Sequence, residues 1–234
     1  MRKLWRRSRL IKETQSTGGF QNTKHRWFPP VLIIAQERRQ TMSVNLSKGQ
    51  KMSLTKDNPS LSKITVGLGW DVNQYSGGAE FDLDASVFVC GANGKCRNDN
   101  DFIFYKNLDS VDGAIHHTGD NKTGIGDGDD EAIQINLTKV AADVQKIAIT
   151  VTIYDANNRR QNFGQVSNAY VRVIDDTTGS EIVHFDLGED FSIETAIVAG
   201  EIYRHNGEWK FNAVGAGFQG GLAALCKNYG IDAE

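Results

Sequence analysis

The feature of this sequence that most constrains its fold is an alternation of apolar and polar residues in two neighbouring segments. Every second side chain is apolar in residues 63–70, and the same holds in residues 81–89. This is the period of a β-strand with one buried face, whereas a helix repeats about every 3.6 residues. The alternation also places Asp82, Asp84 and Ser86 together on one face of the second strand.

Shorter runs rich in β-branched and aromatic residues predict further strands, each bounded by Gly, Asn or Asp. They cover residues 102–105, 133–137, 147–154, 170–174 and 182–185. Residues 201–211 predict a β-hairpin, because Asn206-Gly207 suits a type I′ turn.

One short helix is predicted near the end of the chain. Its apolar positions are Leu222, Leu225, Cys226 and Tyr229, and Gly230 follows as a C-terminal cap. About eight antiparallel strands in a single sheet would leave one apolar face in water. We therefore expect an all-β fold, a two-sheet antiparallel β-sandwich with a short C-terminal helix.

The charge of the chain divides it at Met42. Residues 1–41 contain 10 of the 26 basic residues and 2 of the 29 acidic residues, a balance of +8, which leaves 16 and 27 for residues 42–234, a balance of −11. An acidic domain attracts cations and repels nucleic acid, so no nucleic-acid partner is expected for it. The three cysteines show no CxxC spacing and fit reduced thiols better than a disulfide framework.

Residues 1–41 are interpreted as a basic N-terminal extension, either disordered or absent because translation begins at Met42. Arg38-Arg39 can be encoded as a ribosome-binding sequence just before the Met42 codon. A basic arm that binds nucleic acid or a membrane surface is the alternative. N-terminal mass spectrometry tests the start site, since a peptide that spans Thr41 and Met42 would contradict initiation there. No segment reaches the roughly 20 apolar residues of a membrane helix.

The densest group of chemically active residues lies in residues 118–131, which contain five carboxylates, one lysine and four glycines. Ca²⁺ binds six to eight oxygens from carboxylates, carbonyls and water, and glycines let the backbone turn its carbonyls toward the ion. Asp82 and Asp84, with Asp71 nearby, would supply a rigid wall. Together these features predict a calcium site, and the number of carboxylates suggests more than one ion. The alternative is a solvated acidic turn beside an exposed sheet.

Other kinds of site fit the sequence less well. An EF-hand loop is excluded because Lys122 and Ile125 occupy its third and sixth positions. The G-x-G-x-x-G match at residues 215–220 follows a hairpin strand, so close packing is preferred over nucleotide binding. The adjacent His116 and His117 are interpreted as surface or turn residues. Motifs of hydrolytic enzymes are absent from the sequence.

Six motifs in order resemble the TerD family of tellurium-resistance proteins. They are VGLGWD (66–71), FDLDAS (81–86), FIFYKNL (102–108), HTGDN (117–121), GDGDDE (126–131) and RRQNFGQVSNAYVRV (159–173). The resemblance covers essentially all of residues 42–234. It implies a calcium-binding β-sandwich with two Ca²⁺ ions and a role in resistance to tellurite, other stresses, phage and colicins.

The resemblance also implies which residues bind metal. The candidate ligands are Asp71, Asp82, Asp84, Asp120, Asn121, Asp127, Asp129, Asp130 and Glu131, with backbone carbonyls at Gly124, Gly126 and Gly128. Residues 159–162 are interpreted either as a recognition surface or as a loop that packs against the sandwich.

A calcium-dependent, non-catalytic scaffold is the function that this reading favours. Its expected partners are other tellurium-resistance proteins in a membrane-associated stress complex, and its expected location is the cytoplasm, with peripheral attachment to the inner membrane as an alternative. Two other functions remain open: a calcium-independent structural subunit of such a complex, and a hydrolase that uses the aspartate cluster.

Overall fold

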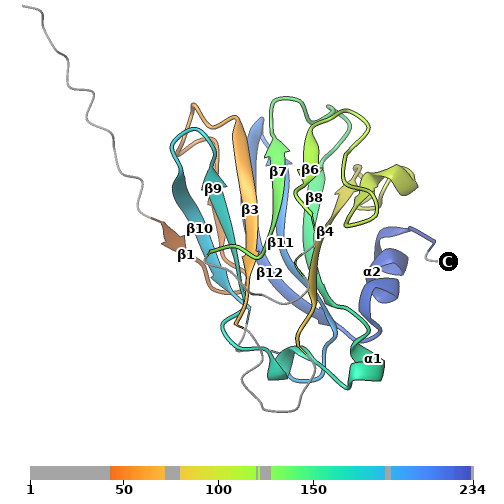
Figure 1. The fold of residues 1–234 in the computed structure, drawn as a ribbon. Coiled ribbons are helices and arrows are strands. Elements are labelled where there is room, and N and C mark those ends of the chain that lie inside the picture. The colour runs from red at the N-terminus through yellow and green to blue at the C-terminus, as the bar shows by residue number, and fades with distance from the viewer. Residues whose placement is uncertain (1–42, 72–79, 120, 122–127, 188–190, 233–234) are drawn as a thin grey trace, which may run out of the picture. The chain divides into compact units, whose positions relative to one another are not determined.

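The computed structural model of the protein describes residues 43–71, 80–119, 121, 128–187 and 191–232. Its strands form two six-stranded sheets that pack face to face (Figure 1). The expected N-terminal extension, residues 1–41, lies outside the described residues.

The first sheet has the strand order β1-β10-β9-β3-β7-β6. The strands are β1 (Val44–Asn45), β10 (Ser180–Asp186), β9 (Tyr170–Asp175), β3 (Lys63–Gly69), β7 (Glu131–Asn136) and β6 (Ile115–His117). Neighbours are antiparallel except for β1, which pairs with β10 in parallel. We call this the β3 sheet.

The second sheet has the order β2-β12-β11-β8-β4-β5, and its pairs are antiparallel. The strands are β2 (Lys51–Ser53), β12 (Glu208–Phe218), β11 (Ala196–His205), β8 (Lys146–Ile153), β4 (Leu83–Cys90) and β5 (Phe102–Ile103). We call this the β4 sheet. The predicted two-sheet antiparallel sandwich is confirmed.

The main core lies between the sheets and is built from alternate residues of each strand. Ile64, Val66 and Leu68 of β3 meet Leu83 and Val87 of β4 in one apolar cluster. Burial of such side chains is the main force that holds the sheets together, at roughly 1.5–3 kcal/mol for each fully buried Val, Leu or Ile. The period of two seen in the sequence therefore reports which side chains enter this core.

A second apolar cluster lies on the outer face of the β4 sheet, under the helix α2 (Gly221–Tyr229). Phe88 of β4 stacks between Phe102 and Tyr229, with ring centroids 4.4 and 4.5 Å apart. Gly230 ends the helix at a φ of +78°, a conformation that glycine adopts without steric cost. The predicted C-terminal helix and its cap are confirmed.

Short elements were not predicted from the sequence. They are the strands β1, β2 and β6, the helix α1 (Ala156–Arg159), and the 3₁₀ turns η1 (Asp99–Asp101) and η2 (Phe163–Gln165). The hairpin turn was predicted, and its Asn206 and Gly207 have φ values of +52° and +78°, as a type I′ turn requires. At Gly217 a Cβ would lie 2.4 Å from Cγ of Glu194, which supports the packing role assigned to the glycines of residues 215–220.

The strands that carry the acidic motifs all begin or end at one end of the sandwich. β3 ends there, and its antiparallel neighbours β7 and β9 begin there. β4 of the opposite sheet also begins there (Figure 1, bottom). We call this the acidic end. No helix within the described ranges is both long and apolar enough to cross a membrane.

Candidate metal centre

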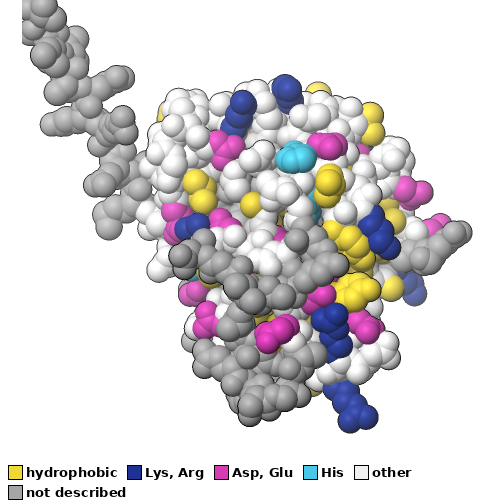
Figure 2. Space-filling view, in the orientation of Figure 1, with side chains coloured by type: hydrophobic (Ala, Val, Ile, Leu, Met, Phe, Trp, Pro, Cys, Tyr) yellow, Lys and Arg dark blue, Asp and Glu magenta, His cyan; other side chains and the backbone are white. Residues whose placement is uncertain are grey.

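The candidate ligands that the structure describes lie at the acidic end. They are Asp71, Asp82, Asp84, Asn121, Gly128, Asp129, Asp130 and Glu131. Figure 2 shows acidic side chains on the lower part of the molecule, where this end lies, as well as others above it. The candidates Asp120, Gly124, Gly126 and Asp127 lie outside the described residues.

Asp129 lies on the outer face of the β3 sheet, in space left by a glycine. A Cβ on Gly67 would lie 2.0 Å from Oδ2 of Asp129, so the carboxylate occupies the place of a side chain. Its Oδ1 accepts hydrogen bonds from Nε of Arg172 at 2.7 Å and from the hydroxyl of Tyr170 at 3.2 Å. Gly69 makes room for the Tyr170 ring in the same way, with a Cβ 2.5 Å from Cζ of the ring. The glycines of the VGLG motif thus form a trough that holds Asp129 and Tyr170.

Tyr170 also donates a hydrogen bond to the backbone carbonyl of Gly128 at 3.1 Å. Burial and the negative charge of Asp129 raise the pKa of Tyr170 to about 12, so its hydroxyl stays protonated and acts as a donor at neutral pH. One oxygen of Asp129 and the carbonyl of Gly128 are therefore bound by protein groups.

Asp130 directly precedes β7 and is hydrogen-bonded to the end of β3. Its backbone N–H donates to the carbonyl of Leu68 at 2.8 Å, and its Oδ2 accepts from the N–H of Trp70 at 3.0 Å. Its Oδ1 accepts from Nδ2 of Asn121 at 3.1 Å. Burial raises the pKa of Asp130, the Trp70 hydrogen bond opposes this, and the charges of Asp129 and Asp71 raise the pKa further. The carboxylates of Asp129 and Asp71 are therefore both close enough to repel that of Asp130.

Glu131 points into the sandwich and is 2% exposed. Its Oε2 accepts a hydrogen bond of 2.6 Å from the backbone N–H of Ala85 in the opposite sheet. Its Oε1 accepts from the N–H of Asn121 at 3.2 Å. Glu131 therefore links the acidic segment before β7 to the beginning of β4.

His117 completes this link, and its interpretation as a surface or turn residue was wrong. It lies in β6 and is 0% exposed, whereas His116 on the same strand is exposed. Its Nδ1 accepts from the N–H of Gly119 at 3.1 Å, so Nε2 carries the proton that is donated to the carbonyl of Ala85 at 3.0 Å. Adjacent residues of a strand point to opposite faces, which is why only one histidine enters the core.

Asp82 and Asp84 lie at the beginning of β4 on the outer face of the β4 sheet. An Nη2 atom of Arg159 lies 3.3 Å from Oδ2 of Asp82. Asp84, 8% exposed, lines a cavity of about 270 Å³ together with Tyr105 and Thr152. The two aspartates share a face, as the alternation predicted.

The loop of residues 159–162 packs against the sandwich. Arg159 contacts Asp82 and lies over the ring of Tyr154, with its guanidinium carbon 5.2 Å from the ring centroid. Nε2 of Gln161, a buried side chain, donates to the carbonyl of Glu80 at 3.2 Å. Of the two interpretations of this loop, packing is the one that these contacts support.

The described carboxylates form two groups on different faces. Asp71, Asp129 and Asp130 belong to the β3 sheet, whereas Asp82 and Asp84 belong to the outer face of the β4 sheet, and Glu131 lies between the sheets. Within the described ranges, no three His, Cys, Asp or Glu side chains are arranged so that they could hold a metal ion. The assignment of individual metal ligands stays a prediction.

The chemistry of the donors nevertheless fits a hard cation. Asp71, Asp129 and Asp130 offer carboxylate oxygens, the ligands that Ca²⁺ prefers, and the charges of Asp129 and Asp71 add to the effect of burial in raising the pKa of Asp130. A divalent cation would neutralise this repulsion. The described donors thus suit the ion in kind, whereas a complete coordination sphere would need the candidates outside the described ranges or water.

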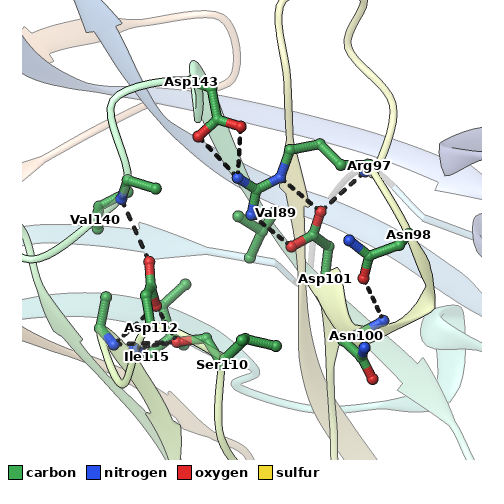
Figure 3. A pocket seen from close by; sticks show the side chains of 13 residues that line it. Val89, Arg97, Asn98, Asn100, Asp101, Ser110, Asp112, Ile115, Val140 and Asp143 are labelled. Atoms are coloured by element: carbon green, nitrogen blue, oxygen red, sulfur yellow. Dashed lines mark hydrogen bonds and ion pairs between the residues drawn. The ribbon is translucent and has the colours of Figure 1, made fainter.

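A separate cavity of about 520 Å³ lies at the other end of β4 and β7 (Figure 3). Arg97 points between Asp101 and Asp143 and is hydrogen-bonded to both. Asp112 accepts hydrogen bonds from the hydroxyl of Ser110 and from the N–H groups of Ala114 and Ala141, and these lower its pKa even though burial opposes them. Arg97, Asp101 and Asp143 are thus engaged with one another, and Asp112 is held by a hydroxyl and by backbone N–H groups. This cavity was not predicted from the sequence.

Four contributors to the acidic end were missed from the sequence, namely Arg172, Tyr170, Gly67 and Gly69, and so was the inward direction of the predicted ligand Glu131. Arg172 and Tyr170 alternate with the core residues Val171 and Val173, so the period of two already placed them on the outer face. Glu131 shares the period of Ile133 and Ile135, which indicated an inward-facing carboxylate. Gly67 and Gly69 occupy the outward positions of β3, where glycine signals the close approach of another group.

Comparison with known sequences gives a consistent result. The sequence profile of the TerD domain matches residues 42–229. General stress protein 16U of Bacillus subtilis is 58% identical over 190 residues, which cover 81% of this chain and 98% of that protein. Tellurium resistance protein TerD of Serratia marcescens is 57% identical over 193 residues, which cover 82% of this chain and 100% of that protein.

A solved structure shares the fold. The crystal structure of a homologue of telluride resistance protein (TerD) from Streptomyces coelicolor A3(2) superposes with a TM-score of 0.59 at 24% sequence identity. The match covers 71% of this chain and 95% of that chain. At this identity the likeness concerns the fold alone.

Proposed function

The chain belongs to the TerD family, and from this premise we propose that residues 42–234 act as a calcium-binding module in tellurite resistance and the general stress response. The names of two relatives more than 50% identical to this chain, a tellurium resistance protein and a general stress protein, support the biological role. The geometry of the acidic end supports the calcium chemistry.

The observation that carries the proposal is the crowding of Asp71, Asp129 and Asp130. Burial and like charges make the ionised form of Asp130 unfavourable without a cation. A bound Ca²⁺ would supply the positive charge that the described groups around Asp130 lack, since Arg172 is turned toward Asp129 and Glu181. Asp71 and Asp130 are the described residues that we assign to this ion, and Asp120 and Asp127 are the candidates outside the described ranges.

A second ion is proposed at Asp82 and Asp84, on the outer face of the β4 sheet. The hydrogen bond between Glu131 and Ala85 lies between the two acidic groups, and it joins the backbone of β4 to the segment that carries Asp130. Occupation of either site would therefore stiffen the same contact between the sheets. We infer that calcium fixes the loops of the acidic end in a form that a partner binds, and that the module is a scaffold without catalytic activity.

A calcium-independent structural subunit is the second candidate. It is favoured by the protein donors that already bind the carboxylates: Arg172 and Tyr170 on Asp129, and Asn121 on Asp130. In this case the acidic end would be stable without metal, and the acidic face would bind a basic protein partner directly.

Isothermal titration calorimetry with Ca²⁺ on the full chain separates the two candidates. Substitution of Asp130 by Asn should remove one binding event, and substitution of both Asp82 and Asp84 by Asn should remove the other. Asp186→Asn, an exposed aspartate near the end of β10 with a side chain 77% exposed, is the matched control and should keep both. If titration of the unchanged protein with Ca²⁺ produces no heat of binding, the structural subunit is favoured.

The biological role is tested separately by expression in a bacterial host that lacks its own TerD-family genes. Growth in tellurite should improve with the unchanged chain and with Asp186→Asn. It should not improve with the variant that combines Asp82→Asn, Asp84→Asn and Asp130→Asn. Equal protection by the triple variant would contradict a calcium-dependent role.

A further inference from the structure

Two cysteines face each other at the end of the β4 sheet remote from the acidic end. Cys90 and Cys96 form an isolated antiparallel bridge between the last residue of β4 and the segment that leads to β5. The N–H of Gly91 donates to the carbonyl of Lys95 at 2.9 Å, whereas the N–H of Cys96 donates to Tyr229 at 3.0 Å. The backbone hydrogen bond therefore lies beside the cysteine pair and does not join it.

This kind of pair brings side chains close together. In a non-hydrogen-bonded antiparallel pair the Cα atoms lie about 4.5 Å apart. A disulfide spans Cα separations of roughly 4.4–6.8 Å. The backbone at Cys90 and Cys96 thus already has the spacing that a disulfide needs.

All three cysteines of the chain are free. The S–H of Cys90 donates to the carbonyl of Phe88 at 3.4 Å, and the S–H of Cys96 donates to the carbonyl of Asp101 at 3.9 Å. The neighbouring Cys96 thiol lowers the pKa of Cys90, burial opposes this effect, and the positive charge of Lys146 adds to it. The Cys90 thiol and burial raise the pKa of Cys96. The first thiolate of the pair therefore forms more readily than in an isolated cysteine.

Access to the pair is one-sided. Cys90 is fully buried beneath α2, whereas Cys96 is partly exposed. A small oxidant from solution would therefore meet Cys96 first, with Cys90 behind it as the second thiol. This is the arrangement of an attacking and a resolving cysteine.

The segment that carries Cys96 is held in place from its other side (Figure 3). Arg97 donates from Nε and Nη2 to Asp101 at 2.8 and 2.7 Å, and from Nη1 to both oxygens of Asp143 at 2.8 Å. Bidentate contacts of this kind fix the guanidinium in one geometry. Val89 and Arg97 face the cavity, whereas Cys90 and Cys96 pack with the cluster beneath α2. The clamp keeps the two thiols opposite each other.

We propose that Cys90 and Cys96 form an oxidation site, at which a peroxide converts the two thiols into an intramolecular disulfide. The site is independent of the proposed calcium centre, because it lies at the opposite end of β4 and uses none of the candidate ligands. This pairing was not predicted from the sequence, in which five residues separate the two cysteines.

The chemistry balances with hydrogen peroxide as the oxidant. In the singly ionised pair, the proton of Cys96 moves to the neighbouring Cys90 sulfur, which leaves Cys96 as the thiolate. The Cys96 thiolate attacks one peroxide oxygen, so that an S–O bond forms, the O–O bond breaks and hydroxide leaves, which gives a sulfenic acid. The Cys90 thiol then attacks the Cys96 sulfur. The S–S bond forms, the S–O bond breaks, and the Cys90 proton leaves with the oxygen as water. Two electrons pass from the sulfurs to the peroxide.

The disulfide would also affect how the C-terminal end of α2 is anchored. The carbonyl of Tyr229, the last residue of α2, accepts the N–H of Cys96, and the ammonium group of Lys95 donates to the carbonyl of Asn228. Oxidation would therefore fix the segment that anchors the C-terminal end of the helix. A chain held in this way resists unfolding more than the reduced chain does.

The test uses the full chain, reduced and then treated with hydrogen peroxide. Two of the three thiols should be lost, and dithiothreitol should restore them. Cleavage after lysine separates Cys90 from Cys96 at Lys95, so mass spectrometry should find the two peptides joined by a disulfide. The melting temperature should rise by about 5 °C or more on oxidation.

Two variants serve as comparison. Cys226→Ala removes the buried cysteine of α2 and should still form the disulfide, whereas Cys96→Ser should not. Three thiols that survive peroxide would overturn the proposal. So would a disulfide to Cys226, a disulfide between two chains, or sulfinic acid without a crosslink. The peptide map of the unchanged chain decides these outcomes even if Cys96→Ser fails to fold.

Discussion

The carboxylate of Glu131 in one sheet accepts a 2.6 Å hydrogen bond from the backbone N–H of Ala85 in the other. Ala85 lies beyond the part of β4 that pairs with β5, which comprises Val87 and Phe88. Its carbonyl accepts from Nε2 of His117 at 3.0 Å. Two buried side chains of the β3 sheet thus satisfy the peptide groups that a longer neighbouring strand would bind. The acidic end is therefore part of the structural link between the sheets.

Glu131→Ala should destabilise the protein in the presence of a chelator, because it leaves a buried N–H without its acceptor. The expected loss is about 2 kcal/mol in the free energy of unfolding, measured by urea denaturation. Glu131→Gln keeps an acceptor oxygen and should lose less. A loss no larger than that of Asp186→Asn, roughly 0.5 kcal/mol or less, would contradict the role of this hydrogen bond.

The raised pKa of Asp130 predicts a particular dependence of stability on pH. A carboxyl whose pKa is higher in the folded protein than in the unfolded chain loses its proton first in the unfolded chain. Stability in chelator should therefore fall as pH rises from about 4, the ordinary pKa, through the raised pKa of the folded state.

Other carboxyls titrate in the same range, and Asp112 and Glu181 have lowered pKa values that act in the opposite sense. The quantity to measure is therefore the difference in unfolding free energy between the unchanged protein and Asp130→Asn across this range. In chelator, Asp130→Asn should become increasingly more stable than the unchanged protein as pH rises. With calcium at neutral pH, the unchanged protein should be the more stable of the two. A difference that does not change with pH would show that Asp130 is not strained by its neighbours.

Gly67→Ala should displace Asp129, since the new Cβ would lie 2.0 Å from its Oδ2. The expected cost is about 1–3 kcal/mol, from overpacking and from the loss of the contacts to Arg172 and Tyr170. In the double variant with Asp129→Ala, the cost of the alanine at Gly67 should largely disappear. Additive effects of the two substitutions, measured in a double-mutant cycle, would mean that Gly67 is not required to accommodate Asp129.

The long strands of the fold could be predicted because a buried face leaves a period of two in the sequence. β3, the first part of β4 and β12 follow that pattern, whereas the hairpin of β11 and β12 was predicted from its Asn206-Gly207 turn. β6 has three residues, too few to show a period, and so the inward direction of His117 was missed. Burial of a histidine depends on its partners, here Gly119 and Ala85, which only the tertiary structure brings together.

The candidate site was predictable in composition but not in arrangement. The motifs identified the carboxylates, and alternation placed Asp82 and Asp84 on one face. The sequence did not reveal that Asp129 lies on the outer face of the β3 sheet, because strand alternation would place it on the same face as the inward-facing Glu131, two residues later. It also did not reveal that Arg172 binds Asp129, because that contact depends on the register between β3, β7 and β9.

The most direct test of the calcium-binding proposal is thermal unfolding of the full chain with excess Ca²⁺ and with chelator. Calcium at 100 times its dissociation constant should stabilise the native state by roughly 2.7 kcal/mol per independent site, and the melting temperature should rise accordingly. Asp82→Ala and Asp130→Asn should each reduce that rise, and Asp186→Asn should leave it intact. Identical melting curves with calcium and with chelator would contradict the proposal.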